Sequence, residues 1–172
     1  MPADNVEKTE LLRFLGAIGR ELERGIRVNA VGGTALTLLG VKPSTRDIDF
    51  DTSSPDHDVL KKAVGRLSPG YPVDLFTDGF IFSQRLPEDY LAACKPISKL
   101  TNIGLYTISP LDVVCTKIGR LNERDIQDIR LTIAKFGLTP QEVKRRAQAV
   151  EYVGNQENFD SNLEYTLENL FK

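Results

Sequence analysis

Apolar residues recur at two different spacings along the chain, and these spacings predict its helices and strands. A period close to 3.6 predicts a helix over residues 6–23, with its apolar side chains on one face. Short apolar runs between polar or glycine-containing segments predict buried strands instead. The predicted strands occupy residues 27–31, 47–51, 73–76, 97–100 and 103–107, and residues 80–82 fit either a short strand or a segment packed under the sheet.

Further helices are predicted between the strands and throughout the second half of the chain. They occupy residues 34–39, 55–67, 109–121 and 122–136, a stretch that begins at Gln141, and a last amphipathic segment that ends at Leu170. Ser109 and Pro110 are typical of a helix start, and Gly137 and Gly154 interrupt the helical pattern. We therefore expect an α/β (α+β) fold with a mixed sheet and flanking helices over residues 1–108. Residues 109–172 should form a helical portion that packs on this core as one structural unit.

Composition narrows the classes of function. The 172 residues carry a net charge of −2 and are 41% hydrophobic, so a sizeable core is expected but no overall attraction to nucleic acid. The sequence has neither an apolar run of membrane length nor an apolar leader, which predicts a cytoplasmic protein without a membrane span. Cys94, Cys115 and the single His57 cannot make a zinc site, and two reduced thiols fit the same compartment.

The strongest chemical signal combines a diglycine with a pair of carboxylates. Val31-Gly32-Gly33-Thr34 follows a predicted strand, and Asp47 and Asp49 lie two positions apart on the next one. Residues at i and i+2 of a strand share a face, roughly 7 Å apart at Cα, so these carboxylates should repel each other unless a cation lies between them. An oxygen-only site suits Mg²⁺ or Mn²⁺, while glycines let backbone amides approach a phosphate. Together these features predict phosphoryl or nucleotidyl transfer.

This arrangement resembles the nucleotidyltransferase superfamily, whose best-known member is DNA polymerase β. That family has a third acidic residue on a later strand, and Asp74 within Tyr71–Phe76 fits this position. The resemblance implies a nucleotidyltransferase-type sheet in which Asp47, Asp49 and Asp74 bind the metal. It also implies that the diglycine binds the phosphates of an NTP. The second glycine position is often Ser in the family, so a side-chain hydroxyl for phosphate would have to come from Thr34.

A second pattern lies in the predicted helices after Ser109. Pro110-Leu111-Asp112 followed by Lys117, and then Arg124-Asp125 followed by Asp128, resembles a narrower branch that contains the AbiEii-type toxin nucleotidyltransferases and uncharacterised prokaryotic relatives. The resemblance implies that Lys117 contacts the triphosphate and that Asp125 is a supporting acid in the catalytic site.

Several of these residues also have structural interpretations. Asp125 could serve only as a helix-capping acid after Asn122, and Arg124 with Asp128 has the spacing of a surface salt bridge. Asp51 shares the face of Asp49, but we expect it to be solvated at the strand end. The run 144–146 is expected to be a solvated helix face, unless it lies beside the catalytic cleft, where it could hold an RNA backbone. For Arg46, pairing with the acids, phosphate contact and simple solvation all remain open.

The resemblance implies transfer of NMP from an NTP to an acceptor, with Mg²⁺ or Mn²⁺ as cofactor. The acceptor could be an RNA such as the 3′ end of a tRNA, or a partner protein, as for components of toxin–antitoxin pairs. A nucleotide-binding or degenerate regulatory module without turnover is the alternative. A serine or cysteine hydrolase has little support, because the chain lacks a Gly-x-Ser-x-Gly turn and its only histidine is His57.

Overall fold

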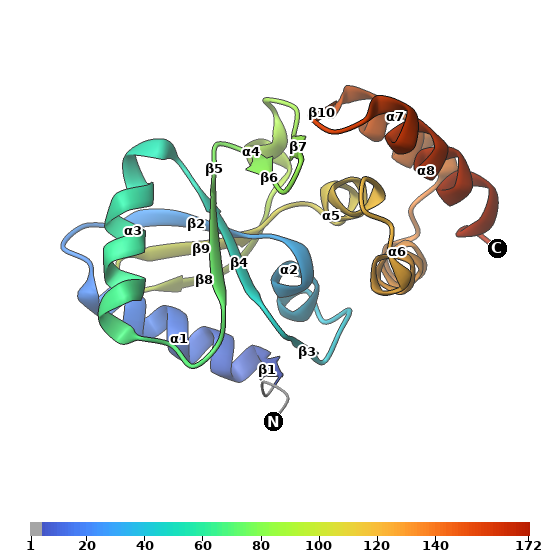
Figure 1. Cartoon of the computed structure of the whole chain (residues 1–172). Coiled ribbons are helices and arrows are strands. Elements are labelled where there is room, and N and C mark those ends of the chain that lie inside the picture. The colour runs from blue at the N-terminus through green and yellow to red at the C-terminus, as the bar shows by residue number, and fades with distance from the viewer. Residues whose placement is uncertain (1–4) are drawn as a thin grey trace.

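A mixed eight-stranded sheet forms the centre of the molecule (Figure 1). The structure is a computed structural model and describes residues 5–172. Strand order in this sheet is β10-β7-β6-β5-β4-β2-β9-β8, and β1 and β3 pair separately. The strands are β1 (Val6–Glu7), β2 (Ile26–Ala30), β3 (Ser44–Thr45), β4 (Ile48–Thr52), β5 (Val73–Thr77), β6 (Phe80–Ile81), β7 (Gln84–Arg85), β8 (Lys95–Leu100), β9 (Ile103–Thr107) and β10 (Glu151–Tyr152).

Helices flank this sheet and make up most of the chain after β9. They are α1 (Lys8–Glu21), α2 (Gly32–Leu38), α3 (Ser54–Leu67), α4 (Tyr90–Ala93), α5 (Pro110–Ile118), α6 (Glu123–Phe136), α7 (Pro140–Ala149) and α8 (Gln156–Asn169). The apolar stripe of α1 is buried, and this helix packs on α3, β8 and β9. The short helix α2 lies between β4 and the helices α5 and α6. The mixed sheet with flanking helices confirms the fold class predicted from the sequence.

The register of β4 places its acidic residues beside specific partners. β4 runs parallel to β5, which sets Asp49 beside Asp74, and antiparallel to β2, which sets Asp51 beside Asn29. Every residue of β4 is buried, because the strand lies between two others at the centre of the sheet. Asp47 comes just before the strand and is exposed, so the predicted strand 47–51 begins one residue later than expected.

Two pairings lie outside the sequence-based expectations. β3 lies where no strand was expected, and it pairs with β1 immediately before α1. More consequentially, β10 leaves the helical portion and pairs with β7 of the sheet, as seen at the top of Figure 1. The second half of the chain is therefore joined to the first by strand pairing as well as by helix packing.

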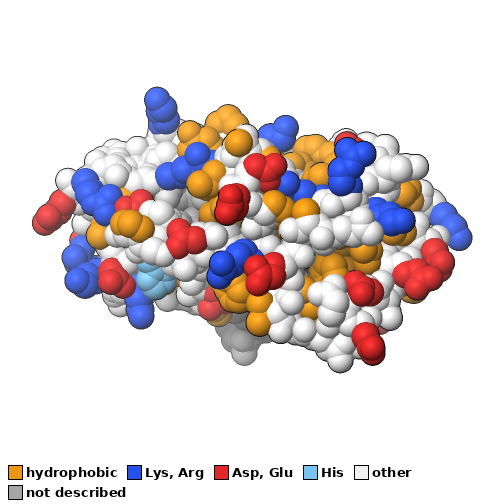
Figure 2. Space-filling view, turned by 90° about the horizontal axis from the view of Figure 1, so that it is seen from above, with side chains coloured by type: hydrophobic (Ala, Val, Ile, Leu, Met, Phe, Trp, Pro, Cys, Tyr) orange, Lys and Arg blue, Asp and Glu red, His pale blue; other side chains and the backbone are white. Residues whose placement is uncertain are grey.

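The surface carries both signs of charge without a dominant patch on the face viewed in Figure 2, where acidic and basic side chains are interspersed. This pattern agrees with the small net charge of −2. In the part of the chain that the structure describes, no helix has both the length and the apolar character needed to cross a membrane.

Candidate active site

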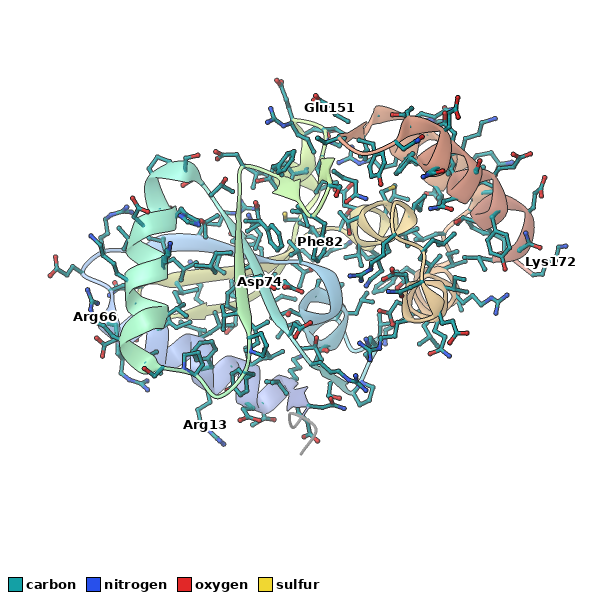
Figure 3. The ribbon with its side chains drawn as sticks, in the orientation of Figure 1. Arg13, Arg66, Asp74, Phe82, Glu151 and Lys172 are labelled. Carbon is teal, nitrogen blue, oxygen red and sulfur yellow. The ribbon has the colours of Figure 1, made fainter. Side chains whose placement is uncertain are left out.

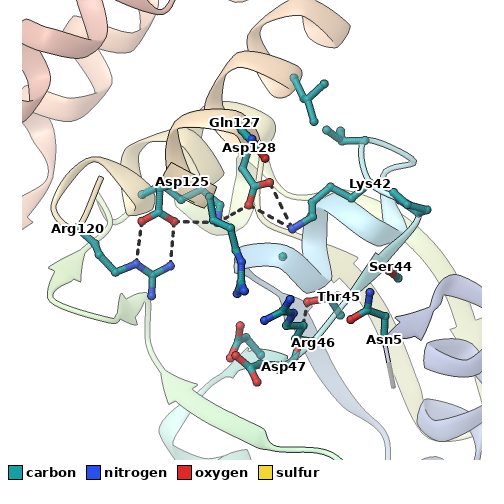
Figure 4. Close-up of a pocket in the computed structure, with 18 of the residues that line it drawn as sticks. Asn5, Lys42, Ser44, Thr45, Arg46, Asp47, Arg120, Asp125, Gln127 and Asp128 are labelled. Carbon is teal, nitrogen blue, oxygen red and sulfur yellow. Dashed lines mark hydrogen bonds and ion pairs between the residues drawn. The ribbon is translucent and has the colours of Figure 1, made fainter. Parts of the chain in front are cut away.

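A cavity of about 460 Å³ lies where the sheet meets α5 and α6 (Figure 4). All the predicted site residues except Thr34 line it, although they come from five separate parts of the chain. Its lining includes the diglycine, acidic residues of the sheet and basic residues of the helices: Gly32, Gly33, Lys42, Arg46, Asp47, Asp49, Asp74, Phe82, Lys117, Arg120, Arg124, Asp125 and Asp128.

Three carboxylates, which we call the acidic wall, occupy the sheet side of the cavity: Asp47, Asp49 and Asp74. Asp49 is only 6% exposed, whereas Asp47 and Asp74 face solvent in the cavity. Burial, followed by the charges of Asp74 and Asp47, raises the pKa of Asp49 from 3.8 to about 7, against the opposing effect of Lys117 and Arg120. Among residues 5–172, none of the three forms an ion pair. The acidic wall therefore carries negative charge that the chain itself does not neutralise.

The two glycines are required for different steric reasons. Gly32 has φ +56°, a left-handed conformation, and a Cβ there would lie 3.1 Å from Oδ2 of Asp49. A Cβ on Gly33 would lie 2.7 Å from Oγ1 of Thr45. The absence of side chains at both positions leaves the backbone at the start of α2 close to the acidic wall.

Two threonine hydroxyls hold the chain that leads into β4. The Thr34 hydroxyl donates to the Asp47 carbonyl at 3.1 Å and accepts from the Asp49 amide at 2.9 Å. The Thr45 hydroxyl donates to the same Asp47 carbonyl at 2.9 Å. Thr34 is fully buried and lies outside the cavity lining, so its hydroxyl fixes the acidic wall against the diglycine.

Opposite the acidic wall, five charged side chains alternate in sign, and we call them the ion-pair ladder. Arg120 forms two hydrogen bonds with Asp125, at 2.7 and 2.8 Å. Lys117 lies 3.5 Å from Asp125 and 3.1 Å from Asp128, and Lys42 lies 3.3 Å from Asp128 (Figure 4). Each carboxylate is thus shared between two cations, which fixes the positions of all three cations at the cavity.

Asp125 has both roles that the sequence allowed, as a helix-capping acid and as a supporting acid in the cavity. Its carboxylate and the Asn122 side chain form a reciprocal capping box at the start of α6, and the same carboxylate holds Arg120 and Lys117. Its burial would raise the carboxyl pKa, but the Arg120 hydrogen bonds and the neighbouring cations outweigh this effect and leave the pKa below its ordinary value. Asp125 is therefore ionised and positions cations within the cavity.

Three sequence-based interpretations were wrong. Asp128 does not form a surface pair with Arg124, because it is 5% exposed and bridges Lys42 and Lys117. In the run 144–146, Lys144 and Arg145 are exposed as expected, but Arg146 forms two hydrogen bonds with the buried Asp112 and another with Asp89. These contacts fasten α7 to α5.

The third error concerns Asp51, which is fully buried rather than solvated. Its carboxylate accepts hydrogen bonds from Asn29, from the Gly79 amide and from the Tyr90 hydroxyl, at 3.2, 3.0 and 2.8 Å. Burial raises its pKa, while the three hydrogen bonds oppose that rise. Asp51 joins β4 to the β5–β6 turn and to α4, so its role is structural.

Local sequence patterns offered little indication of three further cavity residues: Lys42, Arg120 and Phe82. Arg120 lies one helical turn beyond Lys117, and that spacing is the one signal that could have suggested a shared face. Lys42 comes from the segment after α2, and Phe82 from the turn between β6 and β7. Their convergence depends on the sheet topology, which local patterns do not specify.

The donor set of the acidic wall fits a hard divalent cation. Among the described residues, no group of three or more His, Cys, Asp or Glu side chains is arranged to hold a metal ion by itself. Mg²⁺ in phosphoryl-transfer sites is typically bound by one or two carboxylates together with phosphate oxygens of the substrate. Asp47 and Asp49, with Asp74 alongside, supply such carboxylates, and none of the three forms an ion pair among residues 5–172.

Comparisons with known proteins identify the fold and the family. A solved structure, described as the solution structure of the antibiotic-resistance factor ANT(2'')-Ia, matches with a TM-score of 0.60 at 14% sequence identity. The match covers 93% of this chain and 98% of that chain, so the two proteins share a fold. No curated protein matches. A family model described as a nucleotidyltransferase of unknown function (DUF6036) matches residues 17–167, and the chain therefore belongs to this nucleotidyltransferase family.

Proposed function

We propose that this protein is a metal-dependent nucleotidyltransferase that moves NMP from an NTP to an RNA or protein acceptor. The observation that carries the proposal is one cavity in which unpaired carboxylates face cations that buried acids hold in place. Nucleotidyl transfer needs both kinds of group, because the triphosphate is anionic and the acceptor hydroxyl must lose a proton. Family membership and the fold support the same class of reaction.

In this reaction an acceptor oxygen bonds to the α-phosphorus, the bond from that phosphorus to the bridging oxygen of the β-phosphate breaks, and pyrophosphate leaves. Asp47 and Asp49 would hold Mg²⁺ or Mn²⁺, and Asp74 completes the acidic wall. The bound cation would supply charge neutralisation for the phosphates. Asp74 is exposed in the cavity beside Asp49, so we assign it the alignment of the acceptor hydroxyl and the removal of its proton.

The diglycine and the helix side of the cavity would bind the phosphates. Gly32 and Gly33 line the cavity without side chains, so their backbone amides would be available to a phosphate. Lys117 supplies a positive charge, and an ammonium group has three donors, so it can keep its carboxylate contacts and also donate to a phosphate. Asp125 keeps Lys117 and Arg120 in place and does not itself need to contact the substrate.

Two arginines at the cavity are available to contact an acceptor. Arg46 and Arg124 are exposed in its lining and could contact an RNA backbone or an acidic protein segment. We propose an RNA or a partner protein as the acceptor, in a toxin–antitoxin setting. The alternative is a nucleotide-binding module without turnover. Gly33 supplies no hydroxyl where the family often has Ser, and the Thr34 hydroxyl cannot replace it because it is hydrogen-bonded within the protein, which favours this alternative.

The test is label transfer by the purified protein. It would be incubated with each α-labelled NTP and Mg²⁺ or Mn²⁺, in parallel with total RNA and with a protein extract. We expect label on one acceptor class, and loss of transfer by more than about a hundredfold in Asp49→Asn. Asp58→Asn is the matched control, because that side chain is 86% exposed on α3, away from the cavity. NTP binding without transfer to either acceptor would favour the regulatory module, and undiminished transfer by Asp49→Asn would refute the assignment of the acidic wall.

A further inference from the structure

A second cavity of about 350 Å³ adjoins the candidate active site, and the two share Phe82 and Arg120 in their linings. The Arg120 guanidinium lies 5.7 Å from the centre of the Phe82 ring. On its far side the second cavity is lined by Gln84, Gly119 and Tyr152. A ligand there would be separated from the proposed phosphate site by this one pair of side chains.

Phe82 is held in an unusual conformation at this boundary. It has φ +54°, a left-handed value that is rare for a bulky residue, and its side chain is 37% exposed. Its ring packs edge-on against Phe76, with the ring centres 5.0 Å apart, and in Figure 3 it lies between the sheet and α5. Backbone strain of this kind persists where the surroundings enforce it, and it is concentrated at functional sites. The strain here presents an aromatic face to both cavities.

Gln84 lines the second cavity and carries a covered hydrogen-bond acceptor that is unsatisfied. The residue is 2% exposed, and among residues 5–172 its Oε1 has no hydrogen-bond partner. Such an atom is costly to bury unless a ligand or a water molecule completes it. Gln84 is paired directly with Tyr152 in the β7–β10 ladder, so the amide and the phenol ring project from the same face.

Gly119 leaves the space that these two side chains need. A Cβ at this position would overlap the Gln84 amide and lie 2.7 Å from the Tyr152 ring. The cavity therefore combines aromatic rings at two edges, an orphan amide oxygen and a missing side chain. Flat aromatic contacts with one directional polar group are the means by which proteins bind nucleobases.

We propose that the second cavity is a nucleobase subsite, in which the base packs against Phe82 and Tyr152 and an exocyclic amino group of the base donates to the Gln84 amide oxygen, which a half-turn of the side-chain amide brings to the cavity surface. Adenine, cytosine and guanine carry such a group, and uracil does not. The base belongs either to the NTP or to the end of an RNA acceptor, and the inference rests on the proposed function. The competing explanation is a packing defect in which water satisfies Gln84.

The first arm of the test measures NTP binding by calorimetry, with tripolyphosphate as a ligand that lacks a base. If the base comes from the NTP, wild type should bind ATP or CTP about tenfold more tightly than tripolyphosphate or UTP. Gln84→Met and Phe82→Asn should each remove this difference. In Gln84→Met, whose residue does not line the candidate active site, tripolyphosphate affinity should stay within about twofold. Asn tolerates the left-handed conformation of Phe82, and Met removes the orphan oxygen, so Gln84→Met should unfold at the same or a higher temperature.

The second arm measures fluorescence anisotropy of short RNAs that end in adenosine, cytidine or uridine. If the base comes from the acceptor, the preference for adenosine or cytidine ends should appear here and be lost in the same two variants. Tyr165→Ala is the control for both arms, because this exposed ring lines neither cavity. The subsite would be overturned if Gln84→Met and Phe82→Asn kept the base selectivity of wild type in both arms. It would also be overturned if wild type showed no base selectivity in either arm. Failure of wild type to bind either NTP or tripolyphosphate would instead contradict the proposed function itself.

Discussion

The two sides of the main cavity handle charge in opposite ways. On the sheet side, Asp47, Asp49 and Asp74 lie close together without a cation from the described chain, and the pKa of Asp49 rises to about 7. On the helix side, the ion-pair ladder gives every cation a buried carboxylate partner, and the pKa of Asp125 is lowered.

The charges of the ion-pair ladder stabilise the fold, whereas those of the acidic wall are available to a ligand. Removing one member of a buried ion pair leaves its partner uncompensated, so the ladder contributes to the free energy of folding. Like charges that share a site oppose folding until a cation joins them, so the acidic wall is stabilised only by what it binds. The predictions below test this contrast, beginning with the largest expected effect.

Removing Asp125 should cause the largest loss of stability. Asp125→Ala deletes the partner of Arg120 and Lys117 together with the cap of α6, and we expect a loss of about 2–4 kcal/mol in the free energy of unfolding. Chemical denaturation with and without the substitution measures this loss. Glu123→Ala is the control, because Glu123 is exposed at the start of the same helix. A loss as small as that of the control would show that the ladder is not structural.

Asp49 should make the metal-free protein less stable as the pH rises. Its folded pKa of about 7 lies above the unfolded value of 3.8, so the folded state binds the extra proton between these values. Stability should fall by roughly 1–3 kcal/mol as pH rises through this window, and Asp49→Asn should remove that part of the decline. Thermal melts from pH 4 to 8 with chelator, compared between the two proteins, test this. Above pH 7, Mg²⁺ or Mn²⁺ should stabilise wild type alone, and equal stabilisation of Asp49→Asn would place the metal elsewhere.

Lys117 tests whether the ladder also serves the ligand. Lys117→Met removes its charge, whereas Asp125 retains Arg120 and Asp128 retains Lys42. NTP binding should weaken by about 1–2 kcal/mol, and Lys117→Arg should recover only part of the loss. Calorimetry at fixed Mg²⁺ measures the change. Lys135→Ala provides the comparison, since that lysine donates to the Gly40 carbonyl and is absent from the cavity lining. Equal NTP affinity in Lys117→Met and wild type would make this lysine purely structural.

Gly33 tests whether its backbone amide binds phosphate or whether the glycine only makes room for Thr45. Gly33→Ala should lower NTP affinity about tenfold by covering the backbone amide, but it also brings a methyl group against Thr45. The double variant Gly33→Ala with Thr45→Ala removes that contact, and Thr45→Ala alone is the control. If the amide binds phosphate, the double variant stays weak. Full recovery of NTP affinity would mean that Gly33 is needed only to make room for Thr45.

Local patterns predicted much of the fold because its main elements are amphipathic, capped or bounded by glycine. The Ser109 cap, the buried run of β4 and the diglycine are each readable within a few residues. Asp74 joined Asp49 through the resemblance to the nucleotidyltransferase superfamily, because one carboxylate in a short apolar run is unremarkable by itself. These signals were sufficient for the acidic wall and for Lys117, all of which lie in one cavity.

The remaining features depend on contacts between distant segments, which a local pattern does not encode. Asp51 has the same sequence context as Asp49, and only the approach of Tyr90 and Gly79 makes it a buried structural acid. Strands of two residues such as β7 and β10 are too short to show an alternating pattern. The second cavity could not be predicted from the sequence, because the pairing of β7 with β10 forms one of its edges.

The β7–β10 pairing also has a consequence for the timing of folding. During synthesis, β7 emerges well before β10, and the whole of α5, α6 and α7 must follow before the ladder can close. Contacts of such long sequence separation form slowly, because a large loop has to be ordered first. A ribosome-bound chain could thus assemble the acidic wall early while the Gln84–Tyr152 pair is still missing. The proposed metal site and the proposed nucleobase subsite would then form at separate moments, so a chain that stops before β10 should lack base selectivity while it can still bind the metal ion.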